Sequence, residues 1–161
     1  VEEDGDTYSE NAARKAQAFC EASGLVTLAD DSGLEVDVLG GAPGLHSARY
    51  SPLPGANDAD RRALLLRNLS AFPRPWRAHF HATVAVATPE GGLRFADGDC
   101  PGEIIPEERG EGGFGYDCIF LLSELGLTMA ELTREHKNKL SHRARAVRAA
   151  LPILREELSE R

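Results

Sequence analysis

The chain has 161 residues, of which 42% are hydrophobic, and this is enough for one domain with a full hydrophobic core. Its formal net charge of −8 argues against general nucleic-acid binding, which needs a basic face to neutralise phosphates. No apolar run approaches the roughly 20 residues of a membrane-spanning helix, so we expect no membrane partner.

Hydrophobic periodicity divides the chain into helices and strands. Helical segments repeat apolar residues every three or four positions, whereas strand segments alternate apolar and polar residues. The first half of the chain predicts a helix over 7–24, capped by Thr7 or Ser9 and closed by Gly24, then strands over 25–29 and 34–38, a glycine-rich loop over 40–44 and a helix from 57 or 58 to 69. The second half predicts a hairpin of strands 79–86 and 93–96 and a strand over 119–122. A short helix follows a Thr128–Glu131 capping box, and a long helix begins at Ser141 and bends near Pro152.

This order of elements predicts an α/β fold class with a mixed central sheet flanked by helices, in a single domain over residues 1–161. The three cysteines, Cys20, Cys100 and Cys118, are odd in number and have no CxxC spacing. They argue against a disulfide framework or a zinc site and predict a reducing, cytoplasmic location.

Two adjacent carboxylates, Asp30 and Asp31, follow the first predicted strand and precede Ser32 and Gly33. An acidic pair at a strand end, beside a glycine turn, is one way to hold a divalent metal that meets a phosphate-bearing substrate. The same residues are also ordinary turn formers, and the pattern alone leaves both interpretations open.

The segment Gly112-Gly113-Phe114-Gly115-Tyr116-Asp117 is the second candidate site. Its glycines let the backbone approach a ligand, and its two aromatic rings could sandwich a planar base. The alternative is a bulged start of a strand with aromatic rings in the core. No GK[ST] sequence follows, so the segment is not a Walker loop.

A third cluster, Lys137 to Arg143, gathers cations at the predicted start of the C-terminal helix, where the helix dipole favours anions. An anionic ligand would explain this placement, and a solvated helix face is the alternative. His79 and His81 share one strand face without a third metal ligand nearby in sequence, so we expect a solvated face there.

Taken together, these segments resemble the inosine/xanthosine triphosphate pyrophosphatase family, the non-standard purine nucleoside triphosphate pyrophosphatases. The matching residues stand in family order between Glu2 and Arg143: EEDGDTYSENAARKA, ADDSGLEVDVLGGAPGLHSARY, GGFGYD and LTREHKNKLSHR. The resemblance implies a Mg²⁺-dependent homodimer that hydrolyses ITP, XTP and dITP between the α and β phosphates. The products would be the nucleoside monophosphate and pyrophosphate.

The resemblance also implies roles for individual residues. Asp31 would be the general base and a magnesium ligand, and Glu3 would be the other carboxylate at the metal. The residues expected to bind substrate are Ser32, Phe114, Gly115, Tyr116, Asp117, Lys137, His142 and Arg143. A donor from His142 or Arg143 would suit a 6-oxo group and would meet hydrogens on the 6-amino group of adenine.

The chain departs from the family pattern in two places. The family normally starts with a strand and a Thr-Gly-Asn-x-x-Lys phosphate loop before the position of Glu3, and we expect the fold to be N-terminally incomplete in this respect. Cys118 stands where proline is common. Two rival functions stay open at this point: a nucleotide-binding module without catalysis, and a pyrophosphatase for other modified nucleotides.

Overall fold

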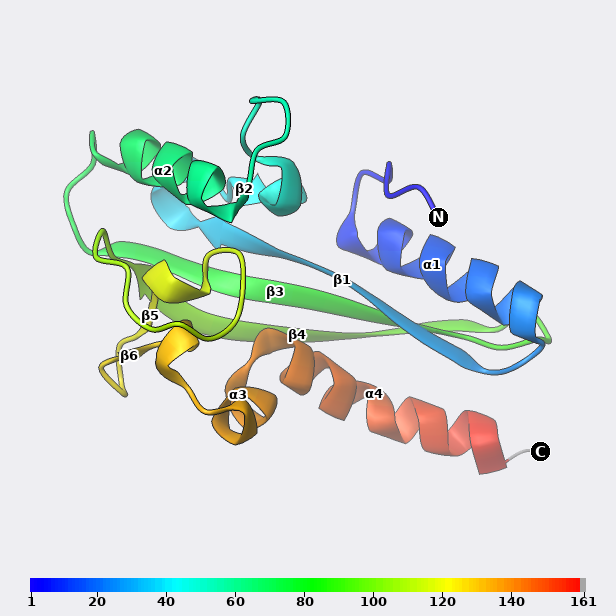
Figure 1. Ribbon diagram of the computed structural model, residues 1–161. Coiled ribbons are helices and arrows are strands. Elements are labelled where there is room, and N and C mark those ends of the chain that lie inside the picture. The colour runs from blue at the N-terminus through cyan, green and yellow to red at the C-terminus, as the bar shows by residue number, and fades with distance from the viewer. Residues whose placement is uncertain (160–161) are drawn as a thin grey trace. The chain divides into compact units, whose positions relative to one another are not determined.

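The computed structural model describes residues 1–159 (Figure 1). Contacts within the chain define two compact units: of the described residues, unit 1 comprises 1–32, 81–99 and 141–159, and unit 2 comprises 33–80 and 100–140. Three long strands contribute residues to both units: β1 (Thr27–Val36), β3 (Trp76–Ala87) and β4 (Leu93–Ile104). Each unit has its own hydrophobic core, and the single domain stays a prediction.

Two helices cover opposite faces of the strands in unit 1, α1 (Tyr8–Ser23) on one face and α4 (His142–Ser159) on the other (Figure 1). Successive residues of β3 point alternately to the two helices, as a period of two requires. The α4 side of the core contains Ala82, Val84, Val86, Ala146, Ala150 and Ile153, and the α1 side contains Ala12, Ala16, Cys20, Ala85 and Ala87.

The ends of these helices follow from their capping residues. Thr7 Oγ1 accepts a hydrogen bond from the Glu10 N–H at 3.1 Å, and Gly24 ends α1 with a φ of 68°. Ser141 Oγ accepts from the Ala144 N–H at 3.2 Å at the start of α4. Both helices are thus confirmed at the predicted positions. Pro152 lies inside α4.

The acidic segment lies within a strand and forms no turn. Residues 30–33 belong to the continuous strand β1, so the prediction of two strands over 25–29 and 34–38 is wrong. Gly33 has no positive φ. β1 is hydrogen-bonded between β2 and β3, and the side chains of Asp30, Asp31 and Ser32 have partners on its two faces.

Unit 2 contains α2 (Asp58–Leu69), α3 (Arg134–Leu140) and three short strands, β2 (Pro43–Gly44), β5 (Phe120–Leu122) and β6 (Leu127–Thr128). The strands are hydrogen-bonded in the order β2-β1-β3-β4-β5-β6. The pairs β1–β2, β4–β5 and β5–β6 are antiparallel. The α/β fold class is confirmed. The largest fully buried side chains of this unit are Phe120, Leu34, Leu65, Leu69, Ile104, Ile119, Met129 and Val36.

Local signals in unit 2 are partly confirmed. Asn57 caps α2, which confirms one of the two predicted caps, and its side chain also forms a capping box with Asp60. The predicted capping box of Thr128 and Glu131 is confirmed, and the short helix that it begins is a single 3₁₀ turn, Met129–Glu131. Lys137 lies in the last turn of α3, so its predicted place at the start of the C-terminal helix is wrong. A cation at the C-terminal end of a helix is favoured by the helix dipole.

Within residues 1–159, no helix combines the length and the apolar character that a bilayer crossing requires.

Gly98 on β4 lies directly against the backbone of α4. A Cβ at this position would lie 2.2 Å from the Ala146 nitrogen and 2.4 Å from the His142 oxygen, both backbone atoms. We predict that Gly98→Ala lowers the free energy of unfolding by about 2 kcal/mol or more, measured by urea denaturation. Arg94→Ala on the same strand removes exposed ion pairs with Glu156 and Glu157 and should change the free energy of unfolding far less. Equal effects of the two substitutions would contradict this packing.

Candidate functional site

Asp31 lies on the α1 side of β1, where polar residues of α1 contact its carboxylate. Asn11 Nδ2 donates a hydrogen bond to Asp31 Oδ2 at 3.0 Å. Lys15 Nζ lies 3.7 Å from Asp31 Oδ1 and 2.5 Å from Glu3 Oε1. The carboxylates of Glu3 and Asp31 therefore flank a single ammonium group in unit 1.

Asn11 connects the two segments that carry these carboxylates. Its side chain is only 2% exposed, and its Oδ1 accepts a hydrogen bond from the Gly5 N–H at 2.8 Å. With Nδ2 bonded to Asp31, the amide ties the segment after Glu3 to β1. A buried amide with both ends bonded holds its partners in a defined geometry, because loss of either bond leaves a polar group unsatisfied.

Sequence reasoning assigned no role to Asn11 or Lys15. Both lie in the matching segment EEDGDTYSENAARKA and are four residues apart, so they share one face of the helix. They also flank the buried Ala12 and Ala16, which places them beside the face that packs on the sheet. Their position beside the packed face is the feature of the sequence that could have indicated a role for these two residues.

The donor set of Glu3 and Asp31 fits Mg²⁺. Magnesium in nucleotide enzymes is typically held by one or two carboxylates together with substrate phosphates and waters. Two carboxylate oxygens already lie within 4 Å of one cation, Lys15 Nζ. Among residues 1–159 there is no group of three or more His, Cys, Asp or Glu side chains that could hold a metal by themselves.

Asp30 and Ser32 contact the other helix of unit 1. Arg143 Nε donates to Asp30 Oδ2 at 2.7 Å, and Arg143 Nη2 lies 3.3 Å from Ser32 Oγ. Asp31, between them in sequence, contacts α1 instead. The interpretation of Asp30 and Asp31 as a joint metal pair is therefore wrong, because consecutive strand residues face opposite sides of the sheet. Asp30 orients an arginine and Asp31 faces Lys15.

The glycine-rich segment in unit 2 is anchored by a buried carboxylate. Asp117, 6% exposed, accepts at its Oδ2 from the Phe114 N–H at 3.1 Å and from Lys137 Nζ at 2.6 Å. The Lys137 ammonium also lies 5.2 Å from the centroid of the Phe114 ring. A Cβ on Gly113 would lie 2.1 Å from Asp117 Oδ2, so this turn requires glycine.

The two aromatic rings of this segment have different environments. Phe114 is 65% exposed, whereas Tyr116 is 5% exposed and belongs to the core of unit 2. The Tyr116 hydroxyl donates to the Ser47 carbonyl oxygen at 2.8 Å, and burial raises the pKa of Tyr116, so the group stays protonated. The core interpretation thus holds for Tyr116, and Phe114 presents its ring at the surface.

The expected site residues fall into two groups. Glu3, Asp31, Ser32, His142 and Arg143 lie in unit 1, and Phe114, Gly115, Tyr116, Asp117 and Lys137 lie in unit 2. Within unit 1 the structure joins Glu3 to Asp31 through Lys15 and Ser32 to Arg143. Within unit 2 it joins Phe114, Asp117 and Lys137.

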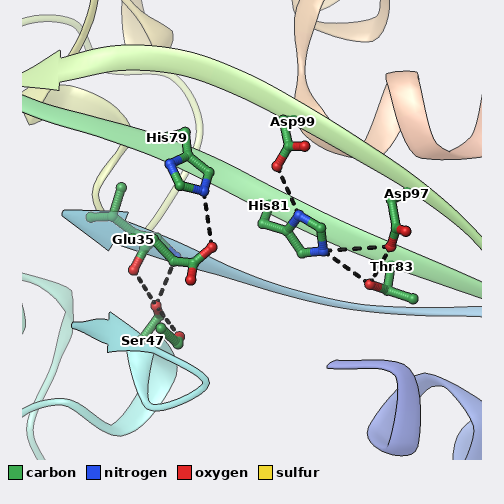
Figure 2. Close-up of polar contacts among 9 residues, drawn as sticks. Glu35, Ser47, His79, His81, Thr83, Asp97 and Asp99 are labelled. Atoms are coloured by element: carbon green, nitrogen blue, oxygen red, sulfur yellow. Dashed lines mark hydrogen bonds and ion pairs between the residues drawn. The ribbon is translucent and has the colours of Figure 1, made fainter. Parts of the chain in front are cut away.

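The two histidines of β3 are held by carboxylates, as Figure 2 shows. In unit 1, His81 Nδ1 lies 2.7 Å from Asp99 Oδ1, and its Nε2 lies 3.0 Å from Thr83 Oγ1. In unit 2, His79 Nε2 lies 2.9 Å from Glu35 Oε2. Each ring thus has a specific acidic partner, which the sequence did not indicate, and both side chains stay partly exposed, at 36% for His79 and 20% for His81.

Comparison with known proteins places this arrangement in a family. The family model described as the Ham1 family matches residues 1–153. The chain belongs to the Ham1 family. The "dITP/XTP pyrophosphatase" of Desulforamulus reducens is 48% identical over 155 residues, which are 96% of this chain and 77% of that protein. The "dITP/XTP pyrophosphatase" of Leifsonia xyli is 50% identical over 154 residues, 95% of this chain and 77% of that protein.

Solved structures of Ham1 proteins are similar in fold to this Ham1 family member. The Staphylococcus aureus Ham1 protein has a TM-score of 0.87 at 39% identity, with 98% of this chain and 81% of that chain covered. The Coxiella burnetii HAM1 protein has a TM-score of 0.88 at 39% identity, with 97% of this chain and 80% of that chain covered. The family resemblance inferred from the sequence motifs is thereby confirmed.

The pair of Lys137 and Asp117 can be tested through stability. Lys137→Met would leave the Asp117 carboxylate buried without its cation, and we predict a loss of roughly 3 kcal/mol in the free energy of unfolding, measured by urea denaturation. The control is Lys139→Met in the same helix, where the ammonium pairs with Glu135 on the surface. It should cost less than about 1 kcal/mol. A smaller loss for Lys137→Met than for Lys139→Met would contradict the anchoring role.

Proposed function

We propose that this chain hydrolyses the non-standard purine nucleoside triphosphates ITP, dITP and XTP to the monophosphate and pyrophosphate, which removes them from the nucleotide pool. The observation that carries the proposal is its near-50% identity, over almost its whole length, to relatives named dITP/XTP pyrophosphatase. The carboxylates of Glu3 and Asp31 around one cation position add chemical support.

In the proposed reaction Asp31 is the general base. Asn11 donates a hydrogen bond to Asp31 Oδ2, and Asp31 Oδ1 is the oxygen that can accept a proton from water. The deprotonated water attacks the α phosphorus, the α–β anhydride bond breaks, and pyrophosphate leaves with the electron pair. Mg²⁺, held by Glu3 and Asp31, would neutralise charge on the triphosphate. Lys15 reduces the repulsion between the two carboxylates.

In the proposed recognition of substrate, Phe114 offers an exposed stacking face for the base. Lys137, Asp117, Gly115 and Tyr116 form and support this segment. Arg143 is oriented by Asp30 and Ser32, and its guanidinium, with His142, is proposed to donate to the 6-oxo group of the purine. The 6-amino group of adenine presents hydrogens and would leave these donors unpaired, which disfavours ATP.

We further propose a cytoplasmic homodimer. Cys20, Cys100 and Cys118 are all free thiols, which is typical of proteins in a reducing compartment. The homodimer is the expectation that follows from the family resemblance.

Asp31→Asn should lower kcat for pyrophosphate release from ITP by about 10²-fold or more, because the amide is a far weaker base. The measurement is coupled detection of pyrophosphate with Mg²⁺, alongside urea unfolding to show that the fold is retained. The adjacent Asp30→Asn faces the opposite side of β1 and should keep kcat within about tenfold. Turnover of Asp31→Asn at the wild-type rate would exclude Asp31 as the base.

Arg143→Ala should lower the ratio of kcat/KM for ITP to that for ATP by about tenfold, because a donor to the 6-oxo group is lost. The same assay with ITP, XTP, ATP, dUTP and TTP measures this and also tests the rival specificity for modified pyrimidines. An unchanged ITP-to-ATP ratio would remove Arg143 from base recognition. Tight ITP binding without pyrophosphate release in the wild-type protein would favour the binding-module alternative.

A further inference from the structure

Two side chains of helix α2 form hydrogen bonds with the backbone of the glycine-rich segment at Gly115. The Gly115 N–H donates to Asp58 Oδ2 at 2.8 Å, and the Gly115 carbonyl oxygen accepts from Arg62 Nη1 at 2.8 Å. Asp58 and Arg62 are four residues apart in α2 and so lie on one face of the helix. One helix therefore satisfies both polar groups of a single glycine 57 positions away from Asp58.

These two contacts fix two consecutive peptide planes. The Gly115 N–H belongs to the peptide that joins Phe114 to Gly115, and its carbonyl belongs to the peptide that joins Gly115 to Tyr116. Gly115 has a φ of +60°, a conformation that glycine adopts without steric cost. Its freedom is removed by the anchors on either side.

The anchoring side chains are themselves held in place. Arg62 Nε donates to Glu108 Oε1 at 2.8 Å, so the guanidinium bridges Glu108 and Gly115. The second oxygen of Asp58, Oδ1, accepts from Arg61 Nη1 at 2.8 Å. The capping box fixes the turn of α2 in which Asp58 lies. Hydrogen bonds to charged groups are roughly twice as strong as those between neutral groups, so Asp58 and Arg62 restrain the Gly115 backbone strongly.

Phe114 is the residue that this arrangement immobilises. The peptide before it is bound to Asp117 through the Phe114 N–H, and the peptide after it is bound to Asp58 through the Gly115 N–H. Its ring is nevertheless 65% exposed. An exposed ring on an immobilised backbone is pre-organised for stacking, because little conformational entropy is lost when a ligand binds.

We propose that Asp58 and Arg62 are positioning residues for the base of the substrate, acting through Gly115 on Phe114. This inference rests on the proposed function, since the ligand is the purine of a nucleoside triphosphate. Neither side chain performs a step of the hydrolysis. Their loss should weaken binding of substrate and transition state alike, which raises KM and leaves kcat nearly unchanged.

The variants are Asp58→Ala, Asp58→Asn and Arg62→Met, with Arg67→Met as the control, an exposed arginine in the same helix. Asn keeps an oxygen that can accept from the Gly115 N–H, whereas Ala does not. Two measurements are made on each variant: amide hydrogen exchange at Gly115 by NMR, and steady-state kinetics with ITP and Mg²⁺.

For Asp58→Ala and Arg62→Met we expect KM for ITP to rise about tenfold, with kcat changed less than about threefold. Exchange of the Gly115 amide should accelerate about tenfold or more in Asp58→Ala. Asp58→Asn and Arg67→Met should stay within about threefold of wild type in both measurements. Should Asp58→Ala fail to fold, Arg62→Met carries the kinetic test.

Three results would overturn the inference: unchanged KM in both Asp58→Ala and Arg62→Met, a fall in kcat with KM unchanged, or equal damage from Asp58→Asn and Asp58→Ala. Failure of the proposed function is distinguished by the wild-type protein, which would then release no pyrophosphate from ITP. In that case the amide exchange at Gly115 still decides whether Asp58 holds the segment.

Discussion

The proposed chemistry depends on the alternation of side chains along β1. In an extended strand, consecutive residues point to opposite faces, and this sends Asp31 toward α1 and Asp30 toward α4. Asp31 thereby meets Asn11 and Lys15 on one face, while Asp30 orients Arg143 on the other. Two neighbouring carboxylates of identical chemistry thus take different roles. A shift of one residue in the strand would exchange those roles.

Much of the fold could be predicted from local signals. Thr7 and Gly24 mark the two ends of helix α1, and the capping box of Asn57 and Asp60 marks the start of α2, so a few residues determine where these helices begin and where α1 ends. The acidic segment misled the prediction because Asp, Ser and Gly favour turns when considered alone. Hydrogen bonding of β1 between two neighbouring strands outweighs that preference and keeps the segment extended.

The site was only partly predictable for the same reason. Motif order indicated Asp31, Phe114 and Arg143, yet it gave no sign that Asn11 links two segments or that Asp58 reaches Gly115. These bonds join residues 20 and 57 positions apart, and their geometry depends on the packing of whole helices. Sequence reasoning therefore identified the residues proposed to meet the substrate, and the structure identifies the residues that hold them.

We propose above all that the carboxylates of Glu3 and Asp31 serve hydrolysis between the α and β phosphates of a non-standard purine nucleotide. The most direct measurement is a ³¹P NMR time course of ITP with the wild-type protein and Mg²⁺. We expect the signals of IMP and pyrophosphate to grow together while no IDP or free phosphate forms. Release of IDP and phosphate, or no consumption of ITP, would contradict it.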